Sequence, residues 1–149
     1  LTEPTPEKVY SKVIEIRKSK LPDPSEIGNA GSFFKNPVVS KAVFQAIAQD
    51  YDSVPHFVVS GSADFPAIEK EQIKIPAAWL IDQAGFKGKT LNKVRCHPTQ
   101  PLVLTNLGGA TGNDVITMAK DIIASVQGKF GIQLEPEVRL LGSKGLISL

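Results

Sequence analysis

The sequence predicts a mixed α+β domain, and three observations carry that prediction. Apolar residues recur at helical spacing in segments such as 9–16, 43–48 and 115–126. Other segments, around 94–106 and 131–141, carry the short apolar or alternating patterns that are typical of strands. The two kinds of segment are interspersed along the chain, and no internal repeat is apparent. Helices packed against sheet are therefore expected, in place of an all-α or all-β fold.

Length and composition describe one globular domain. The 149 residues suffice for a real core, and 42% hydrophobic with 21% charged residues is ordinary for a soluble protein. The net charge of +2 is too small to predict nucleic acid or an anionic membrane as a partner. No segment approaches the roughly 20 apolar residues of a membrane span, and no signal peptide opens the chain. A single cysteine, Cys96, cannot form an internal disulfide, which fits a reducing compartment. Since the chain begins at Leu1 and not at Met, we expect a fragment of a longer protein.

The first expected element is a helix that begins at Thr5-Pro6-Glu7. Thr5 suits the N-cap, Pro6 the first helical position and Glu7 the positive end of the helix. The helix is expected to end before Pro22. Arg17 and Lys20 lie three positions apart near its C-terminal end, hence on one face, where solvated cations complement the helix dipole.

A glycine-bracketed turn, residues 28–31, leads into a segment that we expect to be extended. Side chains alternate between faces in an extended chain, so Ser32, Phe34 and Asn36 would point the same way. A hydroxyl and a carboxamide would then share a surface positioned by buried rings. The alternative is a loop-to-strand junction with an ordinary turn serine, because Gly, Asn and Ser are the usual turn residues.

Two shorter helices are predicted next. The first runs from Pro37 to about Tyr51 and is capped by Ser40, and the second occupies residues 76–84. Between them, residues 51–74 are expected to form a loop with a short strand near 57–59, and this loop could act as a lid.

The last part of the chain alternates strand, helix and strand. Residues 94–106 are expected to form a hairpin, and residues 111–128 a long helix that ends at its final glycine. Residues 131–141 alternate like a strand, with Glu137 on the polar face. Pro136 would cost this strand one ladder hydrogen bond, so an edge strand or a bulge is expected.

Several chemistries are not supported by the residues present. Two histidines and one cysteine, without ligand spacing, do not predict a metal site. No Gly-x-Ser-x-Gly elbow of a serine hydrolase is present. The glycines at positions 108, 109 and 112 match neither a dinucleotide fingerprint nor a P-loop.

Four ordered stretches span nearly the whole chain and are far more specific together than any one alone. They are Lys20-Leu21-Pro22-Asp23-Pro24 with Gly28-Asn29-Ala30-Gly31-Ser32-Phe33-Phe34-Lys35-Asn36-Pro37, then Trp79-Leu80-Ile81-Asp82-Gln83-Ala84-Gly85-Phe86-Lys87-Gly88, His97-Pro98-Thr99-Gln100 and Leu134-Glu135-Pro136-Glu137-Val138-Arg139. The set resembles the C-terminal half of the UDP-N-acetylenolpyruvoylglucosamine reductase family. Members of that family are flavoenzymes that make UDP-N-acetylmuramate for bacterial peptidoglycan.

The resemblance implies an α+β substrate-binding domain without the N-terminal FAD-binding domains of the family. Residues 1–20 would be a helix from the end of the FAD-binding part, residues 21–131 the substrate-binding domain, and residues 132–149 a strand that returns to the FAD-binding part. An arginine that partners the catalytic residues would also lie outside this chain. The fragment alone is therefore expected to be inactive, and its uncovered apolar surface is expected to favour self-association.

The resemblance also implies the chemistry. NADPH reduces a bound FAD, hydride then passes to C3 of the enolpyruvyl ether, and C2 of the resulting enediolate-like intermediate is protonated. Ser32 and Glu137 match the catalytic serine and glutamate and would lie beside the flavin. We hypothesise that Ser32 donates the proton and that Glu137 stabilises the intermediate as a neutral donor, a state that burial of its carboxyl would favour.

The positions matching substrate-binding groups are Arg17, Lys20, Asn36 and Gln100. A cation with neutral amides suits a diphosphate and uridine. In one subtype of the family, a loop that covers the substrate carries an aromatic residue. The corresponding loop here differs from that subtype in length and in sequence, so both Phe57 and Phe65 are candidates for that role.

The expected setting is the bacterial cytoplasm, in cell-wall biogenesis linked to cell shape and cell division. The partners would be a small UDP-sugar and the FAD-binding domains in cis, without nucleic acid, membrane or metal. One alternative is a non-catalytic UDP-sugar-binding module, against which Ser32 and Glu137 argue because pure binding needs neither. Another is an unrelated α+β interaction domain that shares the local turns.

Overall fold

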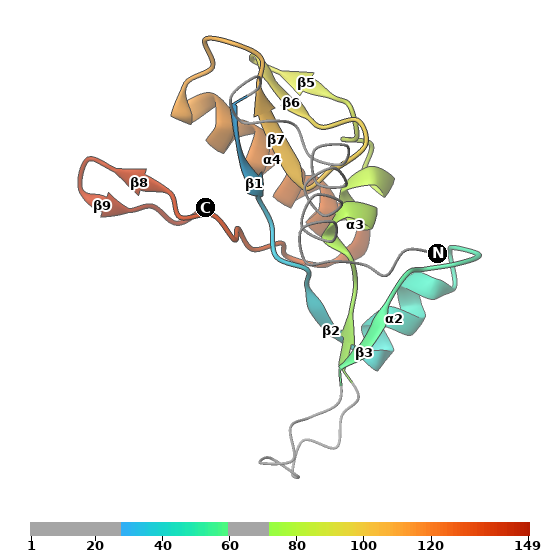
Figure 1. Ribbon diagram of the computed structural model, residues 1–149. Coiled ribbons are helices and arrows are strands. Elements are labelled where there is room, and N and C mark those ends of the chain that lie inside the picture. Colours follow the sequence, from blue (N-terminus) through green and yellow to red (C-terminus); the bar gives the residue numbers. More distant parts are fainter. Residues whose placement is uncertain (1–27, 60–71) are drawn as a thin grey trace, which may run out of the picture.

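The computed structural model describes residues 28–59 and 72–149, so the helix expected near Thr5, with Arg17 and Lys20, lies outside the described residues, as does Phe65. The α+β prediction is confirmed. The described strands form a four-stranded antiparallel sheet in the order β1-β7-β6-β5, a three-stranded sheet in the order β2-β4-β3, and a separate β8-β9 hairpin (Figure 1).

The four-stranded sheet is built around the predicted hairpin. Its strands are Gly28–Ser32 (β1), Val103–Asn106 (β7), Val94–Cys96 (β6) and Thr90–Leu91 (β5). β6 and β7 pair antiparallel, as the pattern over 94–106 predicted. Asn92 and Lys93 join β5 to β6, and both have positive φ angles, 47° and 64°. Such angles at both central residues are typical of a tight type I′ hairpin turn, which the sequence analysis did not predict.

The long helix α4 (Gly112–Phe130) begins at a capping box. Thr111 Oγ1 accepts the N–H of Asp114, and the Asp114 carboxylate accepts the backbone N–H and the hydroxyl of Thr111. These bonds from Thr111 lower the pKa of Asp114. The prediction that the helix ends at Gly128 is wrong: it continues to Phe130, and Gly131, with φ +67°, caps it in the left-handed region.

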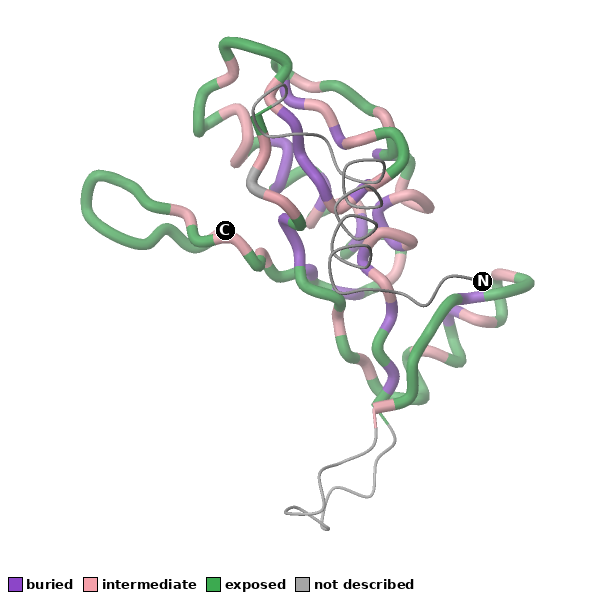
Figure 2. Tube along the Cα trace, viewed as in Figure 1, coloured by how far each residue is buried: buried purple, intermediate pink, exposed green. Residues whose placement is uncertain are grey.

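The core lies between α4, the short helix α3 (Ala77–Gln83) and one face of the four-stranded sheet. Met118, Ile122 and Val126 of α4 are fully buried, as are Val94 and Cys96 of β6. Figure 2 shows this buried layer within the larger lobe of the molecule, which contains the four-stranded sheet with α3 and α4. Full burial raises the pKa of the Cys96 thiol to about 11, and its Sγ–H donates to Pro101 O at 3.2 Å. None of the described helices combines the length and the apolar character that crossing a membrane requires.

The smaller lobe carries one helix on a three-stranded sheet. Its elements are Val38–Ser40 (β2), Lys41–Ala48 (α2), Phe57–Val59 (β3) and Gln72–Lys74 (β4). The cap and the short strand are confirmed, since Ser40 Oγ accepts the N–H of Val43 and β3 covers residues 57–59. Two boundaries differ from the expectation: residues 38–40 form a strand before α2, and residues 72–74 form the central strand of a sheet in a region expected to be a loop.

The chain ends in an exposed hairpin, β8 (Leu141–Gly142) and β9 (Gly145–Leu146). The hairpin projects from the larger lobe in Figure 1. Leu141 and Leu146 are 78% and 72% exposed. An apolar surface of this kind is typical of a contact with another part of a protein.

Candidate functional site

The link between the two lobes, residues 33–37, is held on both sides by backbone hydrogen bonds. The N–H of Phe33 donates to Leu102 O at 2.7 Å, and the carbonyl of Phe33 accepts the N–H of Glu137 at 2.8 Å. The N–H of Lys35 donates to Glu135 O at 2.8 Å. The link is therefore fixed between the end of the β6–β7 turn and the C-terminal segment.

Pro136 lies at the one position in this pairing that needs no N–H donor. Phe34 and Pro136 face each other as an isolated antiparallel bridge. The hydrogen bonds are made by their neighbours, from Glu137 to Phe33 and from Lys35 to Glu135, so the central pair is a non-hydrogen-bonded one. The expectation that Pro136 costs a ladder bond is wrong for this reason. The predicted alternation of burial is confirmed, with Leu134 buried and Glu135 and Glu137 exposed, but residues 131–140 form no strand and pair only through this isolated bridge.

A β-bulge turns the chain immediately before Ser32. Asn29 pairs with Thr105 and Ser32 with Val103, so two residues of β1 oppose one residue of β7. Gly31 adopts φ +76°, and its N–H donates to Asn29 Oδ1 at 2.9 Å. Glycine occupies this left-handed position without strain. The bulge therefore sets the direction in which Ser32 leaves the sheet.

Both phenylalanine rings of the link are buried. Phe33 and Phe34 are 3% and 1% exposed, and their ring centroids lie 5.0 Å apart in an edge-to-face arrangement. Aromatic rings favour this geometry. Two rings anchored in the core hold Ser32 and Asn36 in place, as the sequence analysis expected of buried rings.

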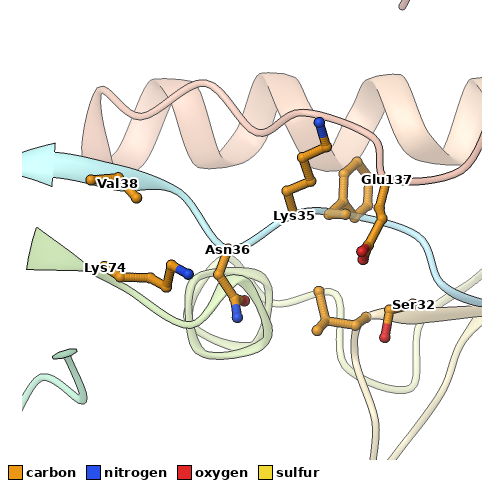
Figure 3. Close-up of a pocket in the computed structure, with 8 residues that line it drawn as sticks. Ser32, Lys35, Asn36, Val38, Lys74 and Glu137 are labelled. Carbon is orange, nitrogen blue, oxygen red and sulfur yellow. The ribbon is translucent and has the colours of Figure 1, made fainter. Parts of the chain in front are cut away.

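A pocket of about 420 Å³ opens along this link. Its lining residues are Ser32, Phe34, Lys35, Asn36, Val38, Lys74, Leu102 and Glu137. Three of the predicted site residues, Ser32, Asn36 and Glu137, thus meet in one pocket although they come from opposite ends of the described chain. Figure 3 shows Ser32 and Glu137 at one end of the pocket, Lys74 at the other, and Asn36 between them. Polar groups converging in a concave site are typical of a ligand-binding site.

The carboxamide of Asn36 is oriented by the core. Its Oδ1 accepts the N–H of Ala77, the first residue of α3, at 2.9 Å. Because the oxygen is committed to this bond, the Nδ2 group is left to donate to a ligand in the pocket. Within the described residues, Asn36 therefore combines a structural contact through Oδ1 with an Nδ2 donor that has no protein partner.

Gln100 lies outside the pocket lining, in the turn that ends at Leu102. His97 Nδ1 accepts the backbone N–H groups of Thr99 and Gln100, at 3.2 and 3.1 Å. Burial and the neighbouring Arg95 lower the pKa of His97, which favours the neutral ring that can accept these bonds. Of the predicted site residues within the described part of the chain, Gln100 is therefore the one that the pocket lining does not include, and its turn is held by His97.

Sequence reasoning missed two cationic residues of the pocket, Lys35 and Lys74. In the extended chain expected for this segment, Lys35 alternates with Phe34 and Asn36 and would lie on the face opposite Ser32. Lys74 falls in the region expected to be a loop, although the alternation Gln72-Ile73-Lys74-Ile75 is a strand signal that could have found it. Arg17 and Lys20, the predicted cations, lie outside the described residues.

A second pocket of about 320 Å³ adjoins the first and shares Lys35, Asn36 and Val38 with it, adding Gln133 and Glu135. Within the described ranges, no group of three or more His, Cys, Asp or Glu side chains is placed to hold a metal ion.

Comparisons with known proteins identify the family to which the chain is similar. Residues 23–141 match the family described as UDP-N-acetylenolpyruvoylglucosamine reductase, C-terminal domain. A relative from Pseudoalteromonas atlantica with the name UDP-N-acetylenolpyruvoylglucosamine reductase is 46% identical over 146 residues, which cover 98% of this chain and 40% of the relative. Relatives of the same name from Bacteroides fragilis and Burkholderia ambifaria are 46% and 47% identical, over 87% and 89% of this chain. The chain spans about two fifths of the length of these curated relatives.

Proposed function

This chain belongs to the UDP-N-acetylenolpyruvoylglucosamine reductase family, and on that premise we propose that it is the substrate-binding part of an enzyme that reduces UDP-N-acetylglucosamine enolpyruvate to UDP-N-acetylmuramate. The observation that carries the proposal is the single pocket that joins Ser32, Asn36 and Glu137. A hydroxyl, a carboxamide donor and a carboxyl group are the groups that this reaction requires for proton transfer and for binding.

The flavin-binding part belongs, in this proposal, to the portion of the relatives that this chain does not span. The boundaries would be a helix from the FAD-binding part over residues 1–20, the substrate-binding domain over 21–131, and a returning segment over 132–149. The exposed leucines of the β8–β9 hairpin support a contact between that last segment and another domain. Without it, the same apolar surface would favour self-association of the fragment.

In this proposal the residues of this chain contact one side of the flavin, and most of the flavin-binding site lies in the FAD-binding part. Ser32 and Glu137 are exposed at the open side of the pocket, where a ring system held by another domain could lie against them. FAD, when bound, would accept a hydride from NADPH and deliver it to C3 of the enolpyruvyl ether. In this arrangement no metal is needed.

Ser32 is the proton donor to C2 in this mechanism. Hydride addition at C3 leaves charge on an enediolate-like intermediate of the substrate, and an enediolate carbon is basic enough to take the hydroxyl proton. The bulge at Gly31 and the buried rings after it fix the direction of Ser32. Placing the donor in advance of reaction lowers the barrier to proton transfer.

Glu137 stabilises the same intermediate by sharing a proton with it. A carboxylate would repel the developing anion, so the group must act in its neutral form. Glu137 is exposed on this chain, and the covering that favours the neutral form would come from the FAD-binding part and the substrate.

The rest of the substrate is an anionic diphosphate linked to uridine and a sugar. Asn36 would donate through Nδ2, Gln100 from the adjoining turn, and Arg17 and Lys20 would supply positive charge from the preceding segment. The reaction would take place in the bacterial cytoplasm and serve peptidoglycan synthesis, and through it cell shape and division.

The test uses the full-length protein with its flavin, reduced anaerobically by NADPH and mixed rapidly with UDP-N-acetylglucosamine enolpyruvate. Flavin reoxidation should be rapid in the wild type and lost in Ser32→Ala, whereas flavin reduction should be nearly unchanged. Ser53→Ala, an exposed serine away from the pocket, is the matched control. Equal loss of both half-reactions in Ser32→Ala would remove the role given to the serine. A reduced flavin that ignores the substrate would favour the non-catalytic UDP-sugar-binding module.

A further inference from the structure

The turn that joins β6 to β7, residues 97–102, is organised around the imidazole ring of His97. Its Nδ1 accepts the backbone N–H of Thr99 at 3.2 Å and that of Gln100 at 3.1 Å. The hydroxyl of Thr99 also lies 3.2 Å from this nitrogen. A ring nitrogen accepts hydrogen bonds only when it carries no proton, so the proton of the neutral ring is on Nε2.

Few other groups in this turn can take the place of Nδ1. The N–H of His97 donates to Val103 O, and the N–H of Val103 donates to Gln100 O, each at 2.9 Å. Pro98 and Pro101 have no N–H and therefore add no donor to the turn. The two amides that point at Nδ1 are thus a large part of what fixes the backbone here.

The same turn forms part of the pocket wall. Leu102 lines the pocket, and its carbonyl accepts the N–H of Phe33 at 2.7 Å. Val103, the next residue, pairs with Ser32. Gln100 is half-buried in this turn, and over residues 28–59 and 72–149 its carboxamide has no hydrogen-bond partner. The conformation of the turn therefore determines where this carboxamide lies relative to Ser32.

The surroundings of His97 keep the ring in its accepting state. Burial lowers the pKa of His97, and the positive charge of Arg95 lowers it further. Arg95 lies two positions earlier, on β6, and is the charged side chain of the described ranges that acts on the ring. The ring is therefore neutral at neutral pH and can accept both amides.

We propose that His97 is a positioning residue for substrate binding, whose Nδ1 fixes the turn that directs the Gln100 carboxamide to the ligand. The proposal rests on the proposed function, in which Gln100 binds the UDP-sugar. Without the acceptor, two amides of the turn lose their partner, and the ligand must order the turn when it binds, at a cost in affinity. Ser32 is held separately by the bulge and the buried rings, so the chemical step should change little.

The experiment compares two substitutions in the flavin-loaded full-length protein. In His97→Asn the amide oxygen takes the place of Nδ1, whereas in His97→Gln it lies near the place of Nε2. His97→Gln should raise the KM for UDP-N-acetylglucosamine enolpyruvate roughly tenfold, and His97→Asn should stay within about twofold of the wild type. The kcat and the rate of flavin reduction by NADPH should change little in both. His56→Gln, at an exposed histidine outside the pocket lining, is the control.

Two further measurements separate positioning from a general loss of structure. If His97 acts through Gln100, the double variant His97→Gln with Gln100→Ala should have the same KM as Gln100→Ala alone. As pH falls below 6.5, the KM of the wild type should rise relative to that of His97→Asn, because protonation of Nδ1 removes the acceptor. The ratio between the two proteins cancels the titration of the substrate itself.

The possible outcomes each decide the matter. A raised KM in His97→Asn but not in His97→Gln would assign the function to Nε2 and overturn the proposal, as would additive losses in the double variant or an unchanged KM in Gln100→Ala. If the wild type does not reduce the UDP-sugar, the proposed function fails, and titration with UDP decides on His97. Weaker UDP binding in His97→Gln than in His97→Asn then supports positioning, and equal binding overturns it.

Discussion

Asn36 Oδ1 accepts a hydrogen bond of 2.9 Å from the backbone N–H of Ala77, between residues 41 positions apart. The bond ties the link between the two lobes to the first turn of α3, whose Ala77, Leu80 and Ile81 are fully buried. The pocket is therefore attached to the core through one of its own polar side chains. Stability and binding can be separated by substitutions at this position.

Asn36→Asp should keep the bond to Ala77, because a carboxylate oxygen also accepts an N–H. Asn36→Ala removes it and should lower the free energy of unfolding by about 1 kcal/mol, as the loss of a capping side chain does. Asn36→Asp should stay within about 0.5 kcal/mol of the wild type and still bind UDP more weakly, since it replaces a donor by a negative charge. Urea denaturation and UDP titration of both variants test this. Tight UDP binding by Asn36→Asp would contradict the role given to Nδ2.

Gly31→Ala should destabilise the protein although nothing crowds the added methyl group. No atom lies within 4 Å of the position that a Cβ would take, so the effect comes from φ +76° alone, about 1 kcal/mol. Gly128→Ala is the matched control. Its Cβ would also meet open space, but Gly128 is helical, so alanine there should stabilise by roughly 0.5–1 kcal/mol. Changes of opposite sign in the free energy of unfolding, measured by urea denaturation, support the left-handed bulge. Changes of the same sign would argue against it.

His97 should make the stability depend on pH. Its pKa in the folded chain lies below the ordinary 6.5, first because of burial and then because of Arg95. The unfolded chain therefore binds the proton first as pH falls, and the stabilisation present above 6.5 is lost as pH falls through and below that value. His97→Asn retains an acceptor for the turn and does not titrate. Between about pH 8 and pH 5, the unfolding free energy of the wild type should fall more steeply than that of the variant.

Cys96 should be chemically inert in the native protein. Its side chain is fully buried and its pKa is raised to about 11, so the thiolate is scarce at neutral pH. A thiol reagent such as dithiobis-nitrobenzoate should react with less than a tenth of the protein in buffer and with one thiol per chain in urea, a contrast of roughly tenfold or more. Rapid labelling without denaturant would show that the β6 layer opens more readily than its packing implies.

The larger elements of the fold could be predicted because their signals are local. Ser40 and Thr111 cap helices where caps were expected, and the hairpin over 94–106 forms as its pattern indicated. The predicted end of α4 was wrong because a glycine can either continue a helix or cap it. Gly128 was expected to end a helix, but only Gly131 has the left-handed angle that ends it. A helical glycine and a capping glycine look alike in sequence.

The candidate site likewise has residues that the sequence predicted and contacts that it did not. The resemblance of motifs selected Ser32, Asn36 and Glu137, and the pocket contains all three. The alternation over residues 72–75 could have indicated the strand that carries Lys74, but its place in the pocket depends on the pairing of this strand with β2 and β3, which the local pattern does not reveal. The separate contact of Asn36 with Ala77 could not be predicted either, since it depends on how the two lobes are placed.

The Phe34–Pro136 bridge also sets an order of assembly during synthesis. The chain leaves the ribosome N-terminus first, so the sheet around Ser32 can form while the segment that carries Glu137 is still untranslated. A nascent chain stalled before residue 136 would contain the serine without its partner. The proposed catalytic pair would therefore be completed late, after most of the scaffold that holds it has been made.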